Sequence, residues 1–448
     1  MTGGEQVTGG EQVTGGEQVT GGEITWSGRF AGRMAGIVRN GPFGVVSFRL
    51  LSVGQLGSTV GDYCYAVALP WLILSAHGGT LLLGTVLACY GVPRTVLIPL
   101  GGILADKLSP RTVMLTADVV RCALVAVLAV LAARQIDSLV VLAPIAALLG
   151  AGEGAFLPAS ASIMPSLLPA EQLAAGNSIS VAMVQVGSLA GPVLGGLLVA
   201  TAGSAPAFAV DAVSFAVSAV ALGLISARQQ EPAAQQAAAA KAPDSDPAGE
   251  QEPAPGLWQI LRQSVFLRLL LAVAVVANFS LSGTFEVAMP ALAHASYGAT
   301  GYGVLLACFA VGVLGGTLGA ARMNAFSKPA AAAYAAFAIQ AVAISLIPFL
   351  GGLPGAAAAM AVTGVCNGFG NIVMFTLLQQ WAPARSLGRI MSLVMLAGFG
   401  TFPISVALAG VLVRHLHAAP FFPIAGITLG VVALIALSRP ETRTFGAS

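Results

Sequence analysis

Ionisable residues lie inside several long apolar stretches of the chain, and four of them are Asp62, Arg94, Glu153 and Glu286. A charge in such surroundings is energetically expensive, so each of these residues is a candidate for function. A carboxyl group that is withdrawn from water and then meets an arginine changes its affinity for a proton. The four residues are therefore candidates for proton coupling. The alternative is a permanent structural ion pair that includes Arg94.

Helical geometry sets the depth of these residues. At about 1.5 Å per residue, Arg94 and Glu153 lie about 15 Å from one end of their helices, and Asp62 lies about 20 Å from the same side. These three side chains are expected to share one layer. Glu286 stands nearer the other side and is followed by Pro290. It either joins a substrate path or is merely an exposed carboxylate.

Other polar and aromatic residues in these stretches are weaker candidates. Asp118 and Arg121 are three residues apart, so they are expected to pair on one helix face in a structural role. Asp211 is assigned a structural role too. Amides at helical spacing either bind substrate or form interhelical hydrogen bonds, which contribute about 0.6–2 kcal/mol each. The candidates for lining a substrate cavity are Tyr65, Tyr90, Asn278, Phe285, Phe309, Asn367, Asn371 and Phe375.

Composition places the chain in a membrane. Of its 448 residues, 56% are hydrophobic and 8% are charged, whereas soluble domains have roughly 25% charged residues. The net charge of +2 and the lack of a basic cluster argue against a nucleic-acid partner. The five cysteines form no CxxC pair, and the four histidines stand near the ends of apolar stretches. Neither a metal nor another cofactor is therefore expected.

Apolar runs of about 20 residues, the length that crosses a bilayer, recur along the chain. They predict an all-α membrane protein with 12 transmembrane helices in two pseudo-symmetric six-helix bundles. The predicted spans are 49–75, 82–104, 112–134, 138–164, 176–201, 206–227, 266–295, 301–323, 331–350, 355–378, 389–413 and 419–438.

Polar segments divide the chain between and around these spans. The first residues repeat the hexapeptide TGGEQV, and such a low-complexity sequence cannot form a core. The predicted organisation is a disordered cytoplasmic tail (1–44), a first bundle (45–227), a cytoplasmic linker with a possible interfacial helix (228–265), a second bundle (266–440) and a short tail (441–448).

The basic residues predict the orientation. With both termini cytoplasmic, Arg134 and Arg414 are the only ones of the 20 lysines and arginines that fall outside, and Arg94 and Arg121 fall within spans. This distribution follows the positive-inside rule. It predicts a multi-pass protein of the bacterial inner membrane.

An internal repeat supports two related halves. The segment from Gly84 reads GTVLACYGV and the segment from Gly303 reads GVLLACFAV. Further matches occur in the same order: Gly150 with Gly364, Gly154 with Gly368, Pro169 with Pro383, and Pro192 with Pro403. Repeated halves are typical of transporters, in which substrate binds near the midplane.

Several motifs resemble those of a known family. The loop after the second predicted span runs from Gly102 through Asp106 to Arg111 and looks like the signature loop of the major facilitator superfamily. The fifth span resembles the antiporter motif of that family's exporters, although Ser178 stands where its first glycine is expected. The residues of this antiporter-type motif are Gly187, Gly191, Pro192, Gly195 and Gly196.

Three shorter matches resemble the bacterial enterobactin-type and macrolide-type exporters of that family. They are Gly61-Asp62 with Ala68-Leu69-Pro70-Trp71, then Gly176-Asn177-Ser178, and then Gly388-Arg389-Ile390-Met391.

The resemblance implies roles for these motifs. Asp106 is expected to bridge to the eleventh span near Gly388 and Arg389 as a conformational switch, with Arg111 orienting the loop; alternatively, these are solvated loop charges. The glycines of the antiporter-type motif stack on one helix face that Pro192 kinks. We interpret that face as a sliding interface between the halves. Ordinary tight packing of small residues is the alternative.

The function expected from these observations is secondary active transport, and an enzyme is not expected. No Walker loop is visible, and neither is a filter loop or a ring of charges typical of a channel. The chain is expected to export a small, lipophilic compound such as a drug, macrolide or siderophore-like metabolite, driven by the proton gradient and working as a monomer. Import of a small nutrient is the alternative, and the antiporter-type motif argues against it.

Overall fold

The computed structural model describes residues 41–76, 78–225, 261–262, 264–322, 326–382 and 384–440, without the side chains of 106, 384–389 and 392. Residues 1–40 and 441–448 of the predicted tails, and all but the end of the predicted linker and interfacial helix, lie outside these residues, whereas Pro42–Gly44 at the end of the first predicted tail form a 3-10 turn. Every regular element within the described ranges is helical. The first group of helices is α2 (Val46–Ser75), α3 (Gly79–Leu108), α4 (Pro110–Ala133), α5 (Leu139–Leu167), α6 (Leu173–Ala202) and α7 (Ser204–Leu224).

The second group contains more helical segments than the sequence predicts. Its members are α10 (Val265–Gly283), the π-helical turn η4 (Thr284–Ala288), α11 (Met289–Ser296), α12 (Gly298–Ala320), α13 (Pro329–Leu346), the 3-10 turn η6 (Ile347–Phe349), α14 (Gly352–Trp381), α15 (Ala384–Phe399), α16 (Phe402–Leu416) and α17 (Phe421–Ser438). Two short 3-10 turns, η1 (Pro42–Gly44) and η2 (Ala170–Gln172), precede α2 and α6.

Eleven helical stretches in the described part of the chain are long and apolar enough to cross a membrane. The 30-residue helix α2 is not among them. One face of α2 is polar: Gln55, Ser58, Thr59 and Asp62 line a cavity among its neighbours. These side chains lower the mean hydropathy of α2, although the helix packs against α6 and α7 inside the first group.

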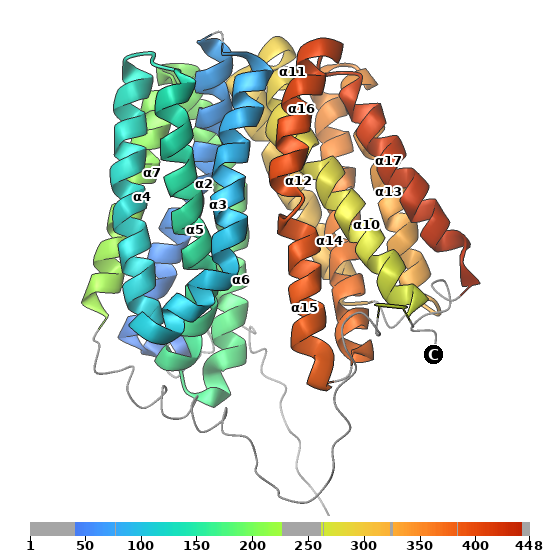
Figure 1. The fold of residues 1–448 in the computed structure, drawn as a ribbon, viewed down its shortest axis with the longest axis horizontal. Helices are drawn as coiled ribbons and strands as arrows, with labels where there is room; N and C mark the ends of the chain where they lie inside the picture. The colour runs from blue at the N-terminus through green and yellow to red at the C-terminus, as the bar shows by residue number, and fades with distance from the viewer. Residues whose placement is uncertain are drawn as a thin grey trace, which may run out of the picture.

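The two groups stand side by side and touch near one end (Figure 1). Helix α6 packs against α12, α3 packs against α16, and α2 meets α11. The α2–α11 contact includes His294, whose ring lies 4.8 Å from the indole of Trp71 and whose Nε2 is 3.3 Å from the hydroxyl of Ser75. The ribbons of the two groups diverge toward the opposite end (Figure 1).

Repeat-related glycines make equivalent contacts in the two groups. A Cβ on Gly150 or Gly154 would strike the carbonyl oxygens of Tyr90 and Arg94, respectively, in α3. A Cβ on Gly364 or Gly368 would strike the carbonyl oxygens of Phe309 and Val313, respectively, in α12. The missing side chains thus let α5 approach α3, and α14 approach α12, in the same way. The predicted correspondence of these two helix pairs agrees with their packing.

The predicted match of Pro192 with Pro403 is wrong. Gly303 packs against the carbonyl oxygen of Pro192, whereas the repeat-related Gly84 packs against that of Val406. Val406 is therefore the structural counterpart of Pro192. Proline marks a kink but does not define the register of a helix, and Pro403 stands almost one turn earlier.

Two predicted spans are interrupted. The predicted span 266–295 contains the π-helical turn η4 between α10 and α11, and the predicted span 389–413 is divided between α15 and α16 at Gly400 and Thr401. Hydropathy alone does not reveal either interruption, because both runs stay apolar on average even though one break contains Thr284 and Glu286 and the other consists of Gly400 and Thr401. Both interruptions lie beside the cavity described next.

Candidate functional site

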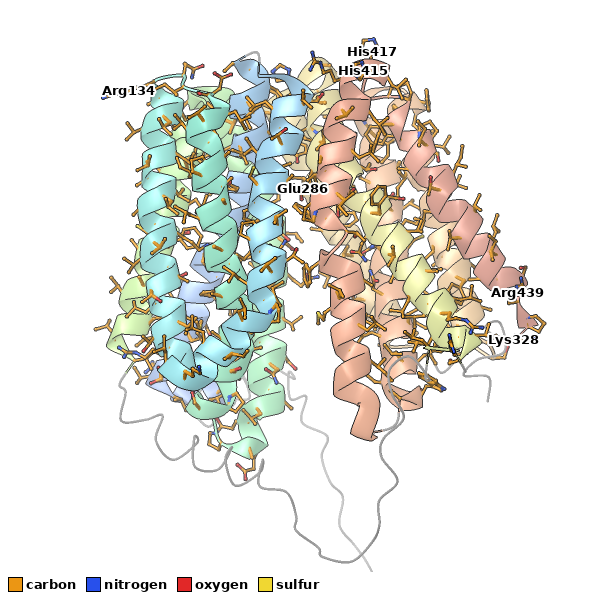
Figure 2. The ribbon with its side chains drawn as sticks, in the orientation of Figure 1. Arg134, Glu286, Lys328, His415, His417 and Arg439 are labelled. Atoms are coloured by element: carbon orange, nitrogen blue, oxygen red, sulfur yellow. The ribbon has the colours of Figure 1, made fainter. Side chains whose placement is uncertain are left out.

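A cavity of about 350 Å³ separates the two groups, and we call it the central cavity. Three of the predicted residues, Asp62, Arg94 and Glu153, line it from the first group, and Glu286 lines it from η4. Figure 2 labels Glu286 between the two groups of helices. The remaining wall is mostly apolar and aromatic: Thr59, Tyr63, Tyr65, Ala66, Leu69, Pro70, Leu87, Tyr90, Val184 and Phe402.

Two ion pairs organise the charges on the first-group side. Arg94 Nη2 lies 3.0 Å from Glu153 Oε1, and both side chains are less than one-fifth exposed. Arg121 Nη2 lies 2.8 Å from Asp62 Oδ1, with the arginine 9% and the aspartate 46% exposed. The Asp62 carboxylate is thus held on one side by a buried cation and remains open to the cavity on the other.

The predicted pairing of Arg121 with Asp118 is wrong. Arg121 reaches α2 to pair with Asp62, and its guanidinium also lies 4.1 Å from the ring centroid of Phe215. Asp118 accepts a hydrogen bond of 2.6 Å from Ser218 instead. A spacing of three residues makes pairing along a helix possible, but an acid on a neighbouring helix is the closer partner here.

Arg121 is therefore a site residue that sequence reasoning missed. The sequence does contain a sign of this pairing. Arg121 is one of only two arginines predicted within spans, and Asp62 is an acid within a different predicted span. Asp211 is also nearer the site than predicted. It is 1% exposed and lines a small cavity of about 30 Å³ with Asp62, Arg121 and Phe215.

Arg94 contacts both groups of helices. Its guanidinium lies 4.9 Å from the ring centroid of Phe399, at the end of α15. The next residue, Thr95, donates a hydrogen bond of 3.2 Å to the carbonyl oxygen of Phe399. The arginine that pairs with Glu153 in the first group therefore also contacts the break between α15 and α16 in the second.

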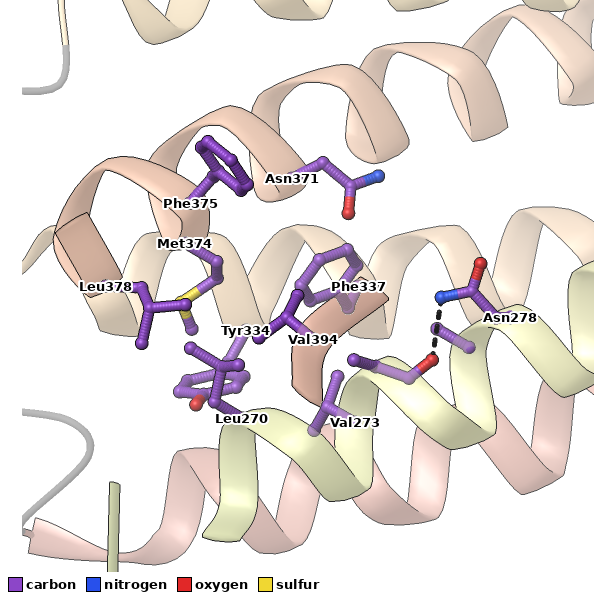
Figure 3. Close-up of a pocket in the computed structure, with 12 residues that line it drawn as sticks. Leu270, Val273, Asn278, Tyr334, Phe337, Asn371, Met374, Phe375, Leu378 and Val394 are labelled. Carbon is purple, nitrogen blue, oxygen red and sulfur yellow. Dashed lines mark hydrogen bonds between the residues drawn. The ribbon is translucent and has the colours of Figure 1, made fainter. Parts of the chain in front are cut away.

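Each group of helices also encloses a cavity of its own. In the first group, a cavity of about 460 Å³ includes Asp62, Arg121 and Glu153 in its wall. In the second group, a cavity of about 80 Å³ lies among α10, α13, α14 and α15 and contains Asn278 and Asn371 (Figure 3). Among the described residues that line it, none is charged.

The residues predicted to line a substrate cavity do not all lie in the same cavity. Tyr65 and Tyr90 line the central cavity. Asn278 and Asn371 do not, and each has a hydrogen bond: Asn278 donates to the carbonyl oxygen of Ala274 at 2.8 Å, and Asn371 donates to Asn367 Oδ1 at 3.1 Å.

Three predicted aromatic residues lie outside the central cavity as well. The rings of Phe285 and Phe309 pack against each other with 4.8 Å between centroids. Phe375 lines the cavity of the second group.

The glycines of the antiporter-type motif make two kinds of contact. Gly187, Gly191 and Gly195 pack against α2 within the first group, so the interpretation of their face as a sliding interface between the groups is wrong. Gly196 faces the other group, where a Cβ would lie 2.8 Å from the carbonyl oxygen of Ala299 and 3.2 Å from the Cα of Gly303. Three of these glycines thus serve ordinary tight packing.

The structure describes only part of the predicted switch loop and of its predicted partner on the eleventh span. The side chains of Asp106 and Arg389, together with the surroundings of Gly388, lie outside the described residues. Arg111 donates hydrogen bonds of 2.7 Å to the carbonyl oxygens of Leu222 and Gly223, and so caps the end of α7. A Cβ on Gly102 would meet only Pro158, at 4.0 Å.

Two groups of membrane-spanning helices around a charged central cavity are the architecture of a membrane transport protein. The family model of the Major Facilitator Superfamily matches residues 51–357, more than half of the chain. The chain belongs to the major facilitator superfamily, and it is a multi-pass protein of the bacterial inner membrane.

Individual relatives agree with this family. The chain is 29% identical over 418 residues to the "Multidrug efflux pump Tap" of Mycolicibacterium fortuitum, covering 90% of this chain and 97% of that protein. Two solved structures share the fold. A bacterial homologue of the iron transporter ferroportin in an inward-facing state has a TM-score of 0.65 at 16% identity, covering 88% of this chain and 99% of that one. A D-xylose-proton symporter has a TM-score of 0.66 at 16% identity, covering 88% and 98%.

Proposed function

We propose that this chain is a proton-coupled exporter of small lipophilic compounds that works by alternating access. The observation that carries the proposal is the central cavity, whose largely apolar and aromatic wall contains the Arg94–Glu153 pair and the Asp62 carboxylate of the second ion pair. Apolar walls suit a lipophilic substrate, and acids in the membrane suit proton transfer.

The proposed topology has twelve spans, with α2 added to the eleven apolar helical stretches. Residues 45–227 form one half, residues 266–440 form the other, and residues 228–265 link them on the cytoplasmic side together with both tails. The positions of charged residues support this. Lys328 and Arg439 lie at one end of the molecule, and Arg134 lies at the other (Figure 2). The contacts between the halves then lie on the outer side, so the described state opens inward.

Export is the proposed direction. The relative named a multidrug efflux pump aligns with nearly the whole chain. One proton that moves down a force of about 150 mV releases about 3.5 kcal/mol. This sustains a substrate gradient of a few hundredfold, which is sufficient for export of a toxic compound.

In the proposed cycle, Asp62 and Glu153 exchange partners. An acid that keeps its arginine remains ionised, and an acid that loses its arginine on the change of conformation binds a proton. Arg94 is placed for this exchange because it contacts Glu153 in one half and Phe399 in the other. Relative movement of the halves would therefore change its surroundings. Asp106 near Gly388 and Arg389 remains the proposed switch on the cytoplasmic side.

Efflux from bacteria that lack their major pumps tests the proposal. Cells that express the chain should retain less of a lipophilic dye, and an uncoupler should abolish the difference. Asp62→Asn or Glu153→Gln should abolish it too, whereas Glu171→Gln, at an exposed turn before α6, should not. Greater retention in cells with the intact chain would instead establish import. Export that survives the uncoupler and both acid variants would exclude proton coupling.

A further inference from the structure

The backbone around Glu286 departs from a regular helix. In an α-helix the N–H of Met289 bonds to the carbonyl of Phe285, but here it bonds to Thr284, five residues back. The carbonyl oxygen of Phe285 instead accepts a hydrogen bond of 3.4 Å from the hydroxyl of Tyr302 in α12. Tyr302 is 2% exposed. A buried side chain of a neighbouring helix thus satisfies a group that the π turn releases.

A second side chain enters the helix one turn earlier. The N–H of Gly283 and the carbonyl of Phe279 are partners in a regular α-helix. The hydroxyl of Ser405, in α16, accepts a hydrogen bond of 2.9 Å from Gly283 and donates one to Phe279. Ser405 is 2% exposed. Insertion of a side chain into the hydrogen-bond ladder is a recognised cause of helix distortion, and π turns are frequent at functional sites.

The distorted segment presents Glu286 to the central cavity. Of the charged residues that line this cavity, Asp62 pairs with Arg121 and Glu153 pairs with Arg94. Glu286 takes part in neither ion pair of the described residues. The four described charged residues that line the cavity and Arg121, the partner of Asp62, together comprise three acids and two arginines, so one acid has no arginine to balance it. A positively charged ligand would balance that acid.

The wall around Glu286 suits an organic cation. Three tyrosines, Tyr63, Tyr65 and Tyr90, line the same cavity, together with Phe402. Aromatic rings attract cations through their π faces, and the apolar wall accepts the rest of a lipophilic molecule.

We propose that Ser405 and Tyr302 are positioning residues that hold the π turn, and that Glu286 in this position binds the cationic group of an amphipathic organic cation. This inference rests on the proposed function, and it assigns the substrate class and the residues that select it. Ser405 and Tyr302 do not line the central cavity themselves; they act through the backbone that carries Glu286.

Binding to the purified full-length protein in lipid nanodiscs tests the proposal. The probes are tetraphenylphosphonium, which carries a fixed positive charge, and Nile red, which is neutral. Glu286→Gln should weaken binding of tetraphenylphosphonium about 10- to 100-fold, and Ser405→Ala about 3- to 10-fold, the range for lost interactions with a charged group and its support. Both variants should bind Nile red as the unmodified protein does.

The double variant separates positioning from general packing. If Ser405 acts through Glu286, adding Ser405→Ala to Glu286→Gln should cause no further loss of tetraphenylphosphonium affinity. The control is Ser345→Ala, because the hydroxyl of Ser345 bonds to Ala341 of its own helix at 2.8 Å. This control should bind both probes normally.

Four results would overturn the proposal. One is that Ser405→Ala weakens tetraphenylphosphonium binding by the same factor in the unmodified protein and in the Glu286→Gln variant. Another is that Glu286→Gln weakens the binding of both probes alike. The unmodified protein could bind Nile red but not tetraphenylphosphonium, which would leave the proposed export of lipophilic compounds standing. If it bound neither probe, the proposed function would fail together with this inference.

Discussion

The ion pair between Arg121 and Asp62 is asymmetric in its burial. The arginine is almost enclosed, stacked near Phe215, while the aspartate is nearly half exposed to the cavities. Loss of one partner of a buried pair is costly because the other charge is left without compensation. The two residues therefore differ in what their removal should do.

Arg121→Gln should lower the free energy of unfolding by about 1–3 kcal/mol, the cost of leaving a partly buried charge unpaired. Asp62→Asn combined with Arg121→Gln should cost less than the sum of the two single changes. Thermal unfolding of the purified protein measures this. Arg134→Gln, at the exposed end of the same helix, is the control and should change stability little. Additive losses would show that the two residues do not stabilise each other.

At this scale the sequence predicted the acids and, as one alternative, an ion pair that includes Arg94, but it did not predict the pairing of Asp62 with Arg121. Asp62, Glu153 and Glu286 were recognisable because an acid in an apolar run is rare. Their pairing depends on how each helix is rotated about its axis, and apolar runs without a polar face carry little information on that rotation. Arg121 was therefore assigned to Asp118 on its own helix, although it points toward α2.

At the scale of the helix, adjacent glycines of α3 should differ sharply. A Cβ on Gly101 would lie 2.8 Å from the Cα of Ala155 in α5 and 2.9 Å from the carbonyl oxygen of Gly154. A Cβ on Gly102 has 4.0 Å of room. The glycine of the signature loop is thus not the one that close packing requires in this state.

Gly101→Ala should destabilise the protein by about 1–3 kcal/mol through overpacking. Gly102→Ala should change stability by less than about 1 kcal/mol, because the helix gains propensity and meets no obstacle. Folded yield in size-exclusion chromatography and thermal unfolding compare the two variants directly. Equal losses at the two positions would contradict a special role for the α3–α5 approach, because only a Cβ on Gly101 would lie against the backbone of α5.

The positions of the helices followed from hydropathy, but their interruptions did not. The proposed supports of the π turn at Thr284–Ala288 are Ser405, 122 residues beyond Gly283, and Tyr302 in α12, 17 residues beyond Phe285. A local pattern cannot report such distant partners. The repeat of glycines predicted which helices pair, because close approach needs small residues wherever it occurs.

At the scale of the molecule, the contact of Ser75 and Trp71 with His294 joins the two halves at one end. Alternating access requires this contact to open during the cycle. A Ser75→Cys and His294→Cys variant, made in a background without the five native cysteines, should be cross-linked by a short bis-methanethiosulfonate reagent.

The cross-linked protein should stop transporting dye, and a reducing agent should restore export. Each single-cysteine variant treated in the same way is the control. Unchanged transport by the fully cross-linked protein would show that the halves do not separate at this contact.

The charges around the central cavity also have an electrical consequence. When all five are ionised, Asp62, Glu153 and Glu286 against Arg94 and Arg121 leave one net negative charge between the halves. Moving a unit charge through the whole membrane field is worth about 2.3 kcal/mol per 100 mV. The carrier loaded with a monovalent cation, or returning with one proton bound, would then cross the field as a neutral unit, whereas movement of the carrier with neither bound would respond to membrane voltage.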